Sequence, residues 1–252
     1  MKQTDKSILC LVDAGNTSIK LSLVRGKRQT FRRFESLSSA LAFFRHLNAD
    51  TAVLSSVRDS KSTQTLSTCL KKISRNFFTA REASLPLFKS RYDLEQLGED
   101  RISALSHALL NHLAPCVIVD AGTAITIDFL NRPNLFLGGY ICAGFQTEWK
   151  TLAMKTALLP RIKIATLIKE RRLPVNTQEA LSSGVIRVKS EGIAALISGH
   201  IQRMKSPPSS WNILISGGDA EILKSSSLFP QAEIIPEIVL KGLKSLALCS
   251  LL

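Results

Sequence analysis

The sequence has few aromatic residues and lacks the long apolar stretches by which membrane and secreted proteins are recognised. Only 6% of its 252 residues are aromatic, and it contains no uncharged apolar stretch of about 18 residues, the length that a membrane-spanning helix needs. The apolar run near the start covers only Ile8 to Val12 before Asp13 interrupts it, which is too short for a secretory signal. We therefore expect a cytoplasmic protein without a membrane partner.

Cysteine is scarce and irregularly placed. The five cysteines are odd in number, show no C-x-x-C spacing and stand mostly among apolar residues. We predict small buried thiols in a reducing compartment rather than a disulfide framework or a zinc site. His107 and His112 stand on a predicted helix at a spacing that does not place them on one face, so we interpret both as structural.

Acidic residues are outnumbered, because 20 Asp and Glu stand against 33 Lys and Arg, which gives a net charge of +13. Basic proteins often bind nucleic acid or acidic membrane surfaces. The basic residues are scattered, however, with short clusters at 25–33, 71–75 and 161–172, and no nucleic-acid motif accompanies them. We predict a solvated basic surface and no nucleic-acid partner, since an anionic small substrate needs only a local basic lining.

The most informative stretch is L-V-D-A-G-N-T-S-I-K at 11–20, which lies between two apolar runs. The pattern predicts a β-hairpin with the carboxylate of Asp13 near its tip. Gly15 permits a ligand to approach the backbone closely, and the next two residues add small polar groups. Lys20 adds a positive charge. A polyphosphate with a metal ion is the ligand that such a tip suits.

A similar stretch recurs as V-D-A-G-T-A-I-T-I-D at 119–128. Asp120 and Gly122 follow Asp13 and Gly15 at one common spacing. For either copy alone, an Asp-Gly turn without a ligand is at least as good an interpretation. Two copies about one small domain apart favour duplicated halves that face each other across a cleft.

The remainder of the first half alternates strands and helices, which indicates a layered α/β fold. We place the boundary between two predicted domains after residue 115, so that they cover residues 1–115 and 116–252. Strands are predicted at 29–34, 51–57 and 77–79, helices at 36–47 and 63–73, and an irregular loop at 83–96.

Asp100 follows this loop, at the predicted start of a helix that Pro115 ends. At that position the helix dipole and the free amides stabilise a carboxylate. Two interpretations stay open here. One is a helix cap paired with a surface arginine, and the other is a general base beside Arg101, which binds an anionic group.

The second half adds paired glycines at Gly138 and Gly139, which imply close backbone packing or a ligand contact. Helices are predicted at 149–159, 180–186 and 192–204. A buried strand at 211–216 leads into Gly217 and Gly218. In α/β folds a Gly-Gly turn after a strand often receives a nucleotide, although this signal alone is weak.

Taken together, these motifs resemble type III pantothenate kinase. The matching segments follow one another along nearly the whole chain: D-A-G-N-T-S-I-K at 13–20, G-E-D-R at 98–101, D-A-G-T-A-I-T-I-D at 120–128, G-G-Y-I at 138–141, N-T at 176–177, S-G-G-D-A at 216–220 and L-K-G-L at 240–243. The resemblance implies two actin-like (ribonuclease H-like) domains of the actin, sugar-kinase and Hsp70 superfamily. Each would have a central mixed sheet, and ATP would lie in the interdomain cleft.

The resemblance also implies a reaction and its cofactors. ATP would phosphorylate pantothenate to 4′-phosphopantothenate, the first step of coenzyme A biosynthesis, with Mg2+ and a monovalent cation, K+ or NH4+. Kinases of this family work as homodimers, with the pantothenate pocket close to the subunit interface.

The functional residues of the family are carried to the matching positions of this sequence. Asp100 would be the general base, Asp120 would help to hold the monovalent cation, and Asp13 would orient Mg2+ through water. The ATP-binding residues would be Asp13, Ala14, Gly15, Asn16, Thr17, Ser18, Ile19, Lys20, Gly122 and Thr123. The pantothenate site would be lined by Tyr92, Gly98, Glu99, Asp100, Arg101 and Thr177.

Some positions depart from the family pattern. Ala143 stands where Ile-x-Pro-Gly is usual, Glu99 where Ala is common, and Asp93-Leu94 where Asn-Pro often precedes the G-x-D-R motif. None of these changes removes a carboxylate or glycine with an assigned role. They mark the substrate site as the part where this chain is expected to differ in shape.

Three other functions stay open at this point. A catalytically silent relative with an accessory or regulatory role is disfavoured by the intact Asp13, Asp100 and Asp120, which a silent copy is free to lose. A nucleic-acid-binding protein would show binding that weakens steeply with salt. A kinase of the same superfamily for another small alcohol would differ at the positions that line the pantothenate site.

Overall fold

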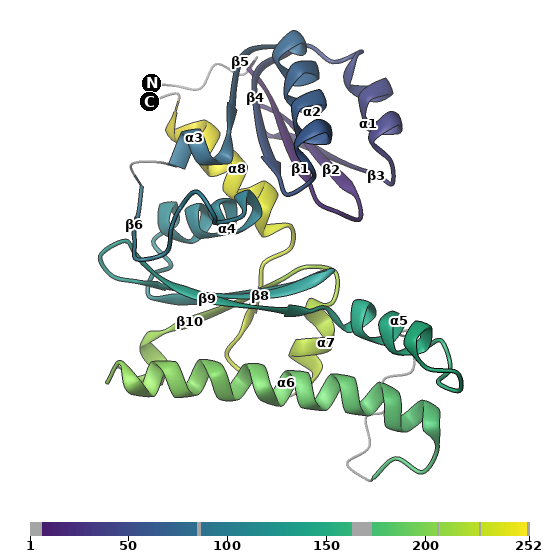
Figure 1. The fold of residues 1–252 in the computed structure, drawn as a ribbon. Helices are drawn as coiled ribbons and strands as arrows, with labels where there is room; N and C mark the ends of the chain where they lie inside the picture. The colour runs from purple at the N-terminus through teal and green to yellow at the C-terminus, as the bar shows by residue number, and fades with distance from the viewer. Residues whose placement is uncertain (1–6, 85–86, 163–172, 206, 227, 251–252) are drawn as a thin grey trace. The chain divides into compact units, whose positions relative to one another are not determined.

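The computed structural model describes residues 7–84, 87–162, 173–205, 207–226 and 228–250 (Figure 1). The chain divides into two compact units. Unit 1 contains residues 1–114, 131–138 and 237–252, and unit 2 contains residues 115–130 and 139–236. Most of the basic cluster at 161–172 lies outside the described residues. The predicted boundary after residue 115 concerns duplicated domains, and it stays a prediction.

Unit 1 is built on a five-stranded mixed sheet with the order β3-β2-β1-β4-β5. The first three strands form an antiparallel meander, whereas β4 and β5 run parallel to β1. The alternating strand and helix pattern of the sequence is therefore confirmed as an α/β arrangement. The strands are β1 (Ile8–Ala14), β2 (Ile19–Arg25), β3 (Arg28–Phe34), β4 (Ala49–Ser56) and β5 (Ser74–Thr79).

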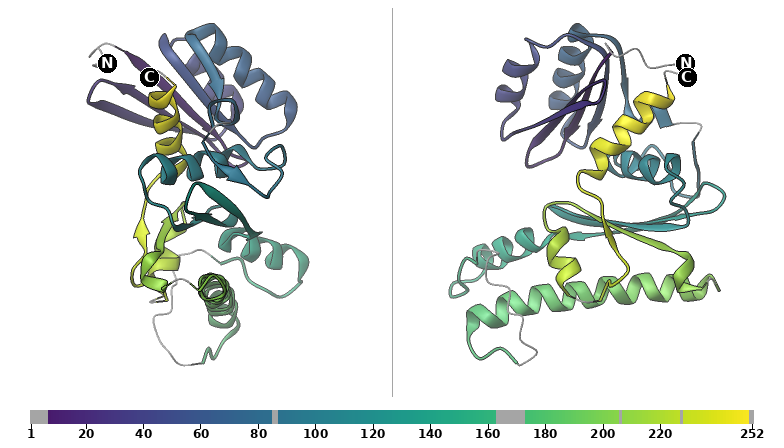
Figure 2. Two further views of the ribbon diagram at one scale, coloured as in Figure 1. Left: turned by 90° about the vertical axis from the view of Figure 1, so that its left-hand side faces the viewer. Right: turned by 180° about the vertical axis from the view of Figure 1, so that it is seen from behind.

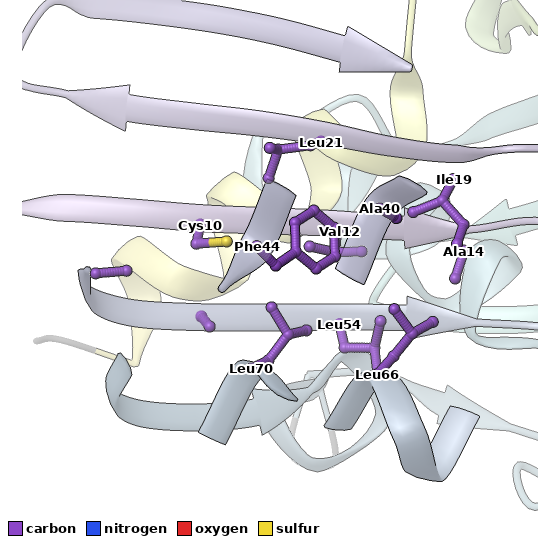
Figure 3. Close-up of a cluster of buried hydrophobic side chains, with 12 residues drawn as sticks. Cys10, Val12, Ala14, Ile19, Leu21, Ala40, Phe44, Leu54, Leu66 and Leu70 are labelled. Atoms are coloured by element: carbon purple, nitrogen blue, oxygen red, sulfur yellow. The ribbon is translucent and has the colours of Figure 1, made fainter. Parts of the chain in front are cut away.

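One face of this sheet is covered by α1 (Leu37–Phe44) and α2 (Ser60–Ile73). Side chains at alternate positions of β1 and β4 point toward these helices and meet Phe44, Leu66 and Leu70 (Figure 3). Because neighbouring strand residues point to opposite faces, Asp13 belongs to the other face of the sheet. The buried side chains of this cluster that Figure 3 labels on the two strands are Cys10, Val12, Ala14 and Leu54.

The rest of unit 1 comprises α3 (Ala80–Ser84), α4 (Glu99–Leu110) and α8 (Ile238–Cys249). The last helix comes from the end of the chain and lies beside α4, as both views in Figure 2 show. Gly242 makes this contact possible, because a Cβ atom there would lie 1.9 Å from the carbonyl oxygen of Ser103. The L-K-G-L motif of the sequence is thus a packing motif of α8.

The second sheet has six strands in the order β11-β10-β7-β8-β9-β6. β7 and β8 form the second predicted hairpin, and β10 runs parallel to β7. The short β6 pairs with the beginning of β9, and both of these segments belong to unit 1. The strands are β6 (Lys89–Ser90), β7 (Cys116–Ala121), β8 (Ala124–Asn131), β9 (Leu135–Ala143), β10 (Asn212–Ser216) and β11 (Glu233–Ile234).

The helices of unit 2 are α5 (Phe145–Lys155), α6 (Thr177–Arg203) and α7 (Ala220–Ser225), with a 3-10 turn η1 at Pro208–Ser210. The prediction of two helices at 180–186 and 192–204 was wrong, because α6 runs through both ranges without a break (Figure 2). Gly192 does not end it, since this glycine keeps a negative φ and its neighbours supply a continuous helical ladder. Among the described residues, no helix is both long and apolar enough to cross a bilayer.

The prediction of small buried thiols holds for part of the cysteine set. Cys10 and Cys116 are buried, and burial raises the pKa of both thiols to about 12. Cys69 is half-buried. The prediction was wrong for Cys142 and Cys249, which are exposed because they lie near the ends of β9 and α8. All five thiols are free.

Candidate active site

The first acidic hairpin is confirmed as the connection from β1 to β2. Asp13 stands opposite Lys20 in the antiparallel register, and Ala14 stands opposite Ile19, so the turn covers residues 15–18. Asn16 and Thr17 at the centre of the turn are exposed, as a ligand-binding tip requires.

Gly15 has space around it. A Cβ atom there would meet only the Ser18 carbonyl oxygen, at an ordinary 3.5 Å, and the backbone has no positive φ. The fold therefore does not need a glycine at this position. Close approach of a ligand to the backbone remains as the physical reason for one.

Two charged side chains from distant parts of unit 1 contact this hairpin. The Arg58 Nη1 atom donates a hydrogen bond to the Gly15 carbonyl oxygen at 2.8 Å. Lys20 Nζ lies 2.6 Å from Glu237 Oε2, and Glu237 precedes α8 in the left-handed conformation with a φ of 53°. Neither Arg58 nor Glu237 belongs to any of the sequence motifs, and no local pattern marks them.

The end of β4 lies beside Asp13. Ser55 faces Asp13 in the parallel register, and its buried hydroxyl has no hydrogen-bond partner among the described residues. The backbone N–H of Ser56 donates to Glu99 Oε2 at 3.1 Å. Burial is the largest influence on Glu99 and raises the pKa of its carboxyl, while the Ser56 hydrogen bond and Arg81 act in the opposite direction. The Glu99 carboxylate thus joins α4 to the strand end.

Asp100 is the second residue of α4, whose N-cap is Gly98, so the predicted position at a helix start is confirmed. Its Oδ1 atom accepts the backbone N–H of Arg101 at 2.7 Å. A Cβ atom on Gly98 would lie 2.5 Å from this oxygen, so the glycine makes room for the carboxylate. Burial raises the pKa of Asp100 despite the Arg101 hydrogen bond and charge, which lower it. A half-buried carboxylate of raised pKa suits proton transfer.

Arg101 is buried, with 5% of its surface exposed. Its guanidinium carbon lies 5.4 Å from the centre of the Tyr92 ring and 5.8 Å from that of Phe136. The two rings are themselves 6.0 Å apart. The structure thus brings together Tyr92 and Arg101, which the resemblance to type III pantothenate kinase implies for one site. It adds Phe136 of β9, to which the sequence analysis assigned no role.

The second acidic hairpin, β7 to β8, is confirmed in unit 2. Asp120 faces Thr126 and Ala121 faces Ile125, and the Gly122 N–H donates to the Ala124 carbonyl at 3.0 Å. A Cβ atom on Gly122 would lie 3.7 Å from its nearest neighbour, so this turn glycine also has space.

The N-terminal end of α5 contacts the second turn. The Gly144 N–H and the Thr147 hydroxyl both donate to the Thr123 carbonyl oxygen, at 3.0 Å and 2.6 Å. A Cβ atom on Gly144 would lie 2.0 Å from the Gly122 carbonyl oxygen. Ala143 precedes this glycine, and its carbonyl accepts the Lys189 ammonium at 2.8 Å, so the loop keeps a fixed contact despite the departure from the family pattern.

The Gly-Gly segment after β10 also packs on the second hairpin. Ser216 faces Asp120 in the parallel register. Gly217 has a φ of 91°, and a Cβ atom there would lie 2.2 Å from the Ala121 carbonyl oxygen and 2.7 Å from Asp120 Oδ1. The Asp219 N–H donates to the same carbonyl at 3.0 Å, and burial raises the pKa of the Asp219 carboxyl. The weak sequence signal at Gly217 therefore marks the surroundings of Asp120.

Thr177 is the first residue of α6 in unit 2 and is exposed. Its neighbour Asn176 caps the helix by accepting the Glu179 N–H at 2.9 Å. No group of three or more His, Cys, Asp and Glu side chains that could hold a metal ion occurs in the described part of the chain. Neither Asp13 nor Asp120 thus belongs to such a group, and any metal ion at either residue needs further oxygen ligands from backbone, water or substrate.

The family model for type III pantothenate kinase matches residues 9–203. The chain belongs to this family. A type III pantothenate kinase of Nitrosomonas eutropha is 31% identical over 257 aligned positions, which cover 96% of this chain and 95% of the relative. One of Synechococcus elongatus is 36% identical over 153 residues, and this alignment spans 60% of each chain.

Solved structures show the same fold at low sequence identity. A protein described as a Baf family transcriptional activator from Campylobacter jejuni gives a TM-score of 0.62 at 21% identity, covering 96% of this chain and 98% of that one. MreB 5 of Spiroplasma citri gives 0.51 at 12% identity, covering 94% and 95%. The actin-like fold predicted from the resemblance is thus confirmed.

Proposed function

We propose that this protein transfers the γ-phosphoryl group of ATP to pantothenate and yields 4′-phosphopantothenate, the first step of coenzyme A biosynthesis. The family match over residues 9–203 carries this proposal. The two acidic hairpins and the carboxylate at the start of α4 support it, because they supply the groups that such a reaction uses.

Asp100 acts as the general base. Phosphoryl transfer passes through a loose transition state, so catalysis depends on positioning and charge neutralisation more than on a strong base. A carboxylate therefore suffices to take the proton of the attacking hydroxyl late in the reaction. Its raised pKa increases its basicity, and the backbone N–H of Arg101 fixes its orientation.

The hairpin of unit 1 binds the phosphates of ATP through Asp13, Ala14, Gly15, Asn16, Thr17, Ser18, Ile19 and Lys20. The exposed turn and the space at Gly15 support this role. Gly122 and Thr123 also bind ATP in this proposal. Mg2+ would neutralise phosphate charge when bound, and Asp13 would orient it through water, because Mg2+ usually keeps several of its water ligands.

Asp120 helps to hold K+ or NH4+. Its carboxylate lies beside the backbone of Gly217 and faces Ser216 across the strand pair, so oxygen atoms are close by, as a hard cation requires. The cation offsets part of the phosphate charge when it is bound.

Pantothenate is bound by Tyr92, Gly98, Glu99, Asp100, Arg101 and Thr177. The Arg101 guanidinium pairs with the pantothenate carboxylate, and the faces of Tyr92 and Phe136 hold it in one orientation. Glu99 acts through its bond to Ser56, which keeps the start of α4 beside the end of β4.

The protein acts as a cytoplasmic homodimer in this proposal, with domains at 1–115 and 116–252. The correspondence of the two Asp-bearing hairpins supports the duplication, because Asp13 faces Ser55 and Asp120 faces Ser216 in equivalent parallel pairs.

Light scattering coupled to gel filtration tests the dimer: a mass near 27.6 kDa, that of one chain, contradicts it.

Release of ADP by the purified protein tests the reaction. ATP, Mg2+ and K+ are supplied with and without pantothenate, and Asp100→Asn is measured beside the unchanged protein. We expect turnover that depends on pantothenate and K+ and that falls by about a hundredfold or more in the variant. Folded protein without any turnover contradicts the kinase assignment.

A further inference from the structure

Arg58 is a charged residue to which neither the sequence pattern nor the resemblance gave a role. It lies between the end of β4 and Asp59, the N-cap of α2. Its hydrogen bond to the Gly15 carbonyl joins residues that are 43 positions apart in the sequence. The loop between β4 and α2 therefore brings an arginine to the turn for which we propose binding of the ATP phosphates.

The guanidinium keeps most of its hydrogen-bonding capacity. It has five N–H donors in a planar fork that matches two phosphate oxygens. Within the described part of the chain, Arg58 uses Nη1 for the Gly15 carbonyl, and no other hydrogen bond of its side chain is present. The donors on Nε and Nη2 are thus available to a ligand at the turn.

The carboxylate of Asp59, the next residue in the sequence, is already hydrogen-bonded to the first turn of α2. It accepts the Ser62 N–H at 2.9 Å and the Ser62 hydroxyl at 2.7 Å. These two bonds are the largest influences that lower its pKa, and the charge of Arg58 makes a smaller contribution. The Asp59 oxygens therefore cap the helix and do not accept hydrogen bonds from the Arg58 guanidinium.

Lys20, the cation within the hairpin itself, differs in this respect. Its ammonium group is 2.6 Å from Glu237, so a carboxylate already balances its charge. Asp13 adds a negative charge at the same end of the hairpin. A polyphosphate needs surplus positive charge there, and Arg58 supplies it.

We propose that Arg58 is a phosphate-binding residue of the ATP site, an inference that rests on the proposed kinase function. Nη1 holds the Gly15 carbonyl and fixes the turn, while the other side of the fork contacts a phosphate. A lysine at this position would replace only part of the function, because one ammonium group lacks the planar fork that reaches both the Gly15 carbonyl and a phosphate.

Equilibrium binding of Mg·ATP, measured by calorimetry, tests the proposal without pantothenate. We expect Arg58→Met to weaken ATP binding by about tenfold to a hundredfold, the range for loss of a hydrogen bond to a charged group. Arg58→Lys should recover part of the affinity. The loss in Arg58→Met should be at least several times larger for ATP than for adenosine, and the variant should show a shallower salt dependence.

Arg28→Met is the matched control. Arg28 belongs to the same sheet and is exposed, but it pairs with Arg25 at the end of the sheet opposite to the Gly15 turn. We expect its ATP affinity to stay within about twofold, since solvent and salt screen so distant a charge. Thermal melting of every variant checks folding, and Arg58→Lys serves if Arg58→Met does not fold.

Two results overturn the inference. One is ATP affinity of Arg58→Met within twofold of the unchanged protein. The other is an equal loss for ATP and adenosine, which shows that the lost affinity does not come from the phosphates. Failure of the proposed function looks different, because unchanged protein that binds ATP but does not phosphorylate pantothenate leaves the binding comparison intact.

Discussion

The two acidic hairpins share the D-A-G sequence, but different kinds of contact support them. Side chains hold the first hairpin, through Arg58 on the Gly15 carbonyl and through the pair of Lys20 and Glu237. Mainly backbone packing holds the second, because Gly144 and Gly217 lie against the carbonyls of Gly122 and Ala121, and the Thr147 hydroxyl adds one hydrogen bond to the Thr123 carbonyl. A side-chain contact can be removed by substituting one residue, whereas a tight backbone contact leaves no room for an added Cβ atom.

The largest effect on stability is expected at Gly217, where the packing of the second hairpin leaves no room for a side chain. In Gly217→Ala, the new methyl group lies 2.2 Å from the Ala121 carbonyl oxygen, and the residue must keep a φ of 91°. We expect a loss of about 3 kcal/mol or more in the free energy of unfolding, measured by urea denaturation.

Gly184→Ala is the matched control for that change. Gly184 lies within α6, and a Cβ atom there meets nothing within 4 Å. Its stability should rise by up to about 1 kcal/mol, because alanine is the better helix former. A destabilisation of Gly217→Ala below about 1 kcal/mol contradicts the claim that backbone packing holds the second turn.

The turn glycines themselves should behave alike in both hairpins. Cβ atoms at Gly15 and Gly122 would have nearest neighbours at 3.5 and 3.7 Å, so Gly15→Ala and Gly122→Ala should change stability by less than about 0.5 kcal/mol. The same methyl groups keep the ATP phosphates away from the backbone. We expect ATP affinity to fall about tenfold, measured by calorimetry. Unchanged ATP affinity in both variants contradicts the claim that these two positions are glycine because the ligand approaches the backbone there.

Burial raises the pKa of two aspartates above the ordinary value of 3.8, Asp100 in unit 1 and Asp219 in unit 2. The folded protein thus binds each proton more tightly than the unfolded chain does. The free energy of unfolding therefore falls as the pH rises from 3.8 to the raised pKa. At neutral pH, Asp100→Asn and Asp219→Asn remove this cost, so both should melt at or above the temperature of the unchanged protein.

Turnover separates these two variants, because only Asp100 has an assigned role in catalysis. Asp219→Asn should keep pantothenate-dependent ADP release, and Asp100→Asn should lose it. A lower melting temperature for both variants at pH 7 together with a higher one near pH 4 shows that the sign of the linkage is wrong.

The smallest effect is expected at the ion pair that supports the first hairpin. Glu237→Gln removes the charge opposite Lys20, and 40% of the Glu237 side chain is exposed. Such pairs contribute about 1 kcal/mol or less, and salt screens them. We expect a small loss of stability that disappears in high salt, measured by urea denaturation in both buffers. A loss above about 2 kcal/mol means that this contact matters as much as the backbone packing in unit 2.

The sequence by itself determined the elements and the chemistry close to each motif. Alternating apolar residues around Asp13 and Asp120 specified both hairpins, because strand periodicity is a local property. The apolar spacing marked α4 and put Asp100 at its start, but the predicted end at Pro115 was wrong, because the helix ends at Leu110 and His112 has a φ of 57°. The same local logic failed at Gly192, where the continuous helix α6 overrides the low helix propensity of one glycine.

The tertiary structure alone decided which distant residues serve each hairpin. Arg58 and Glu237 reach the first hairpin from a loop and from the start of the last helix, and Phe136 on β9 joins Arg101 on α4. No periodicity encodes such contacts, because they arise when separate segments pack around one sheet. Burial likewise set the raised pKa of Asp100, since desolvation depends on everything that surrounds the carboxyl rather than on its neighbours in sequence.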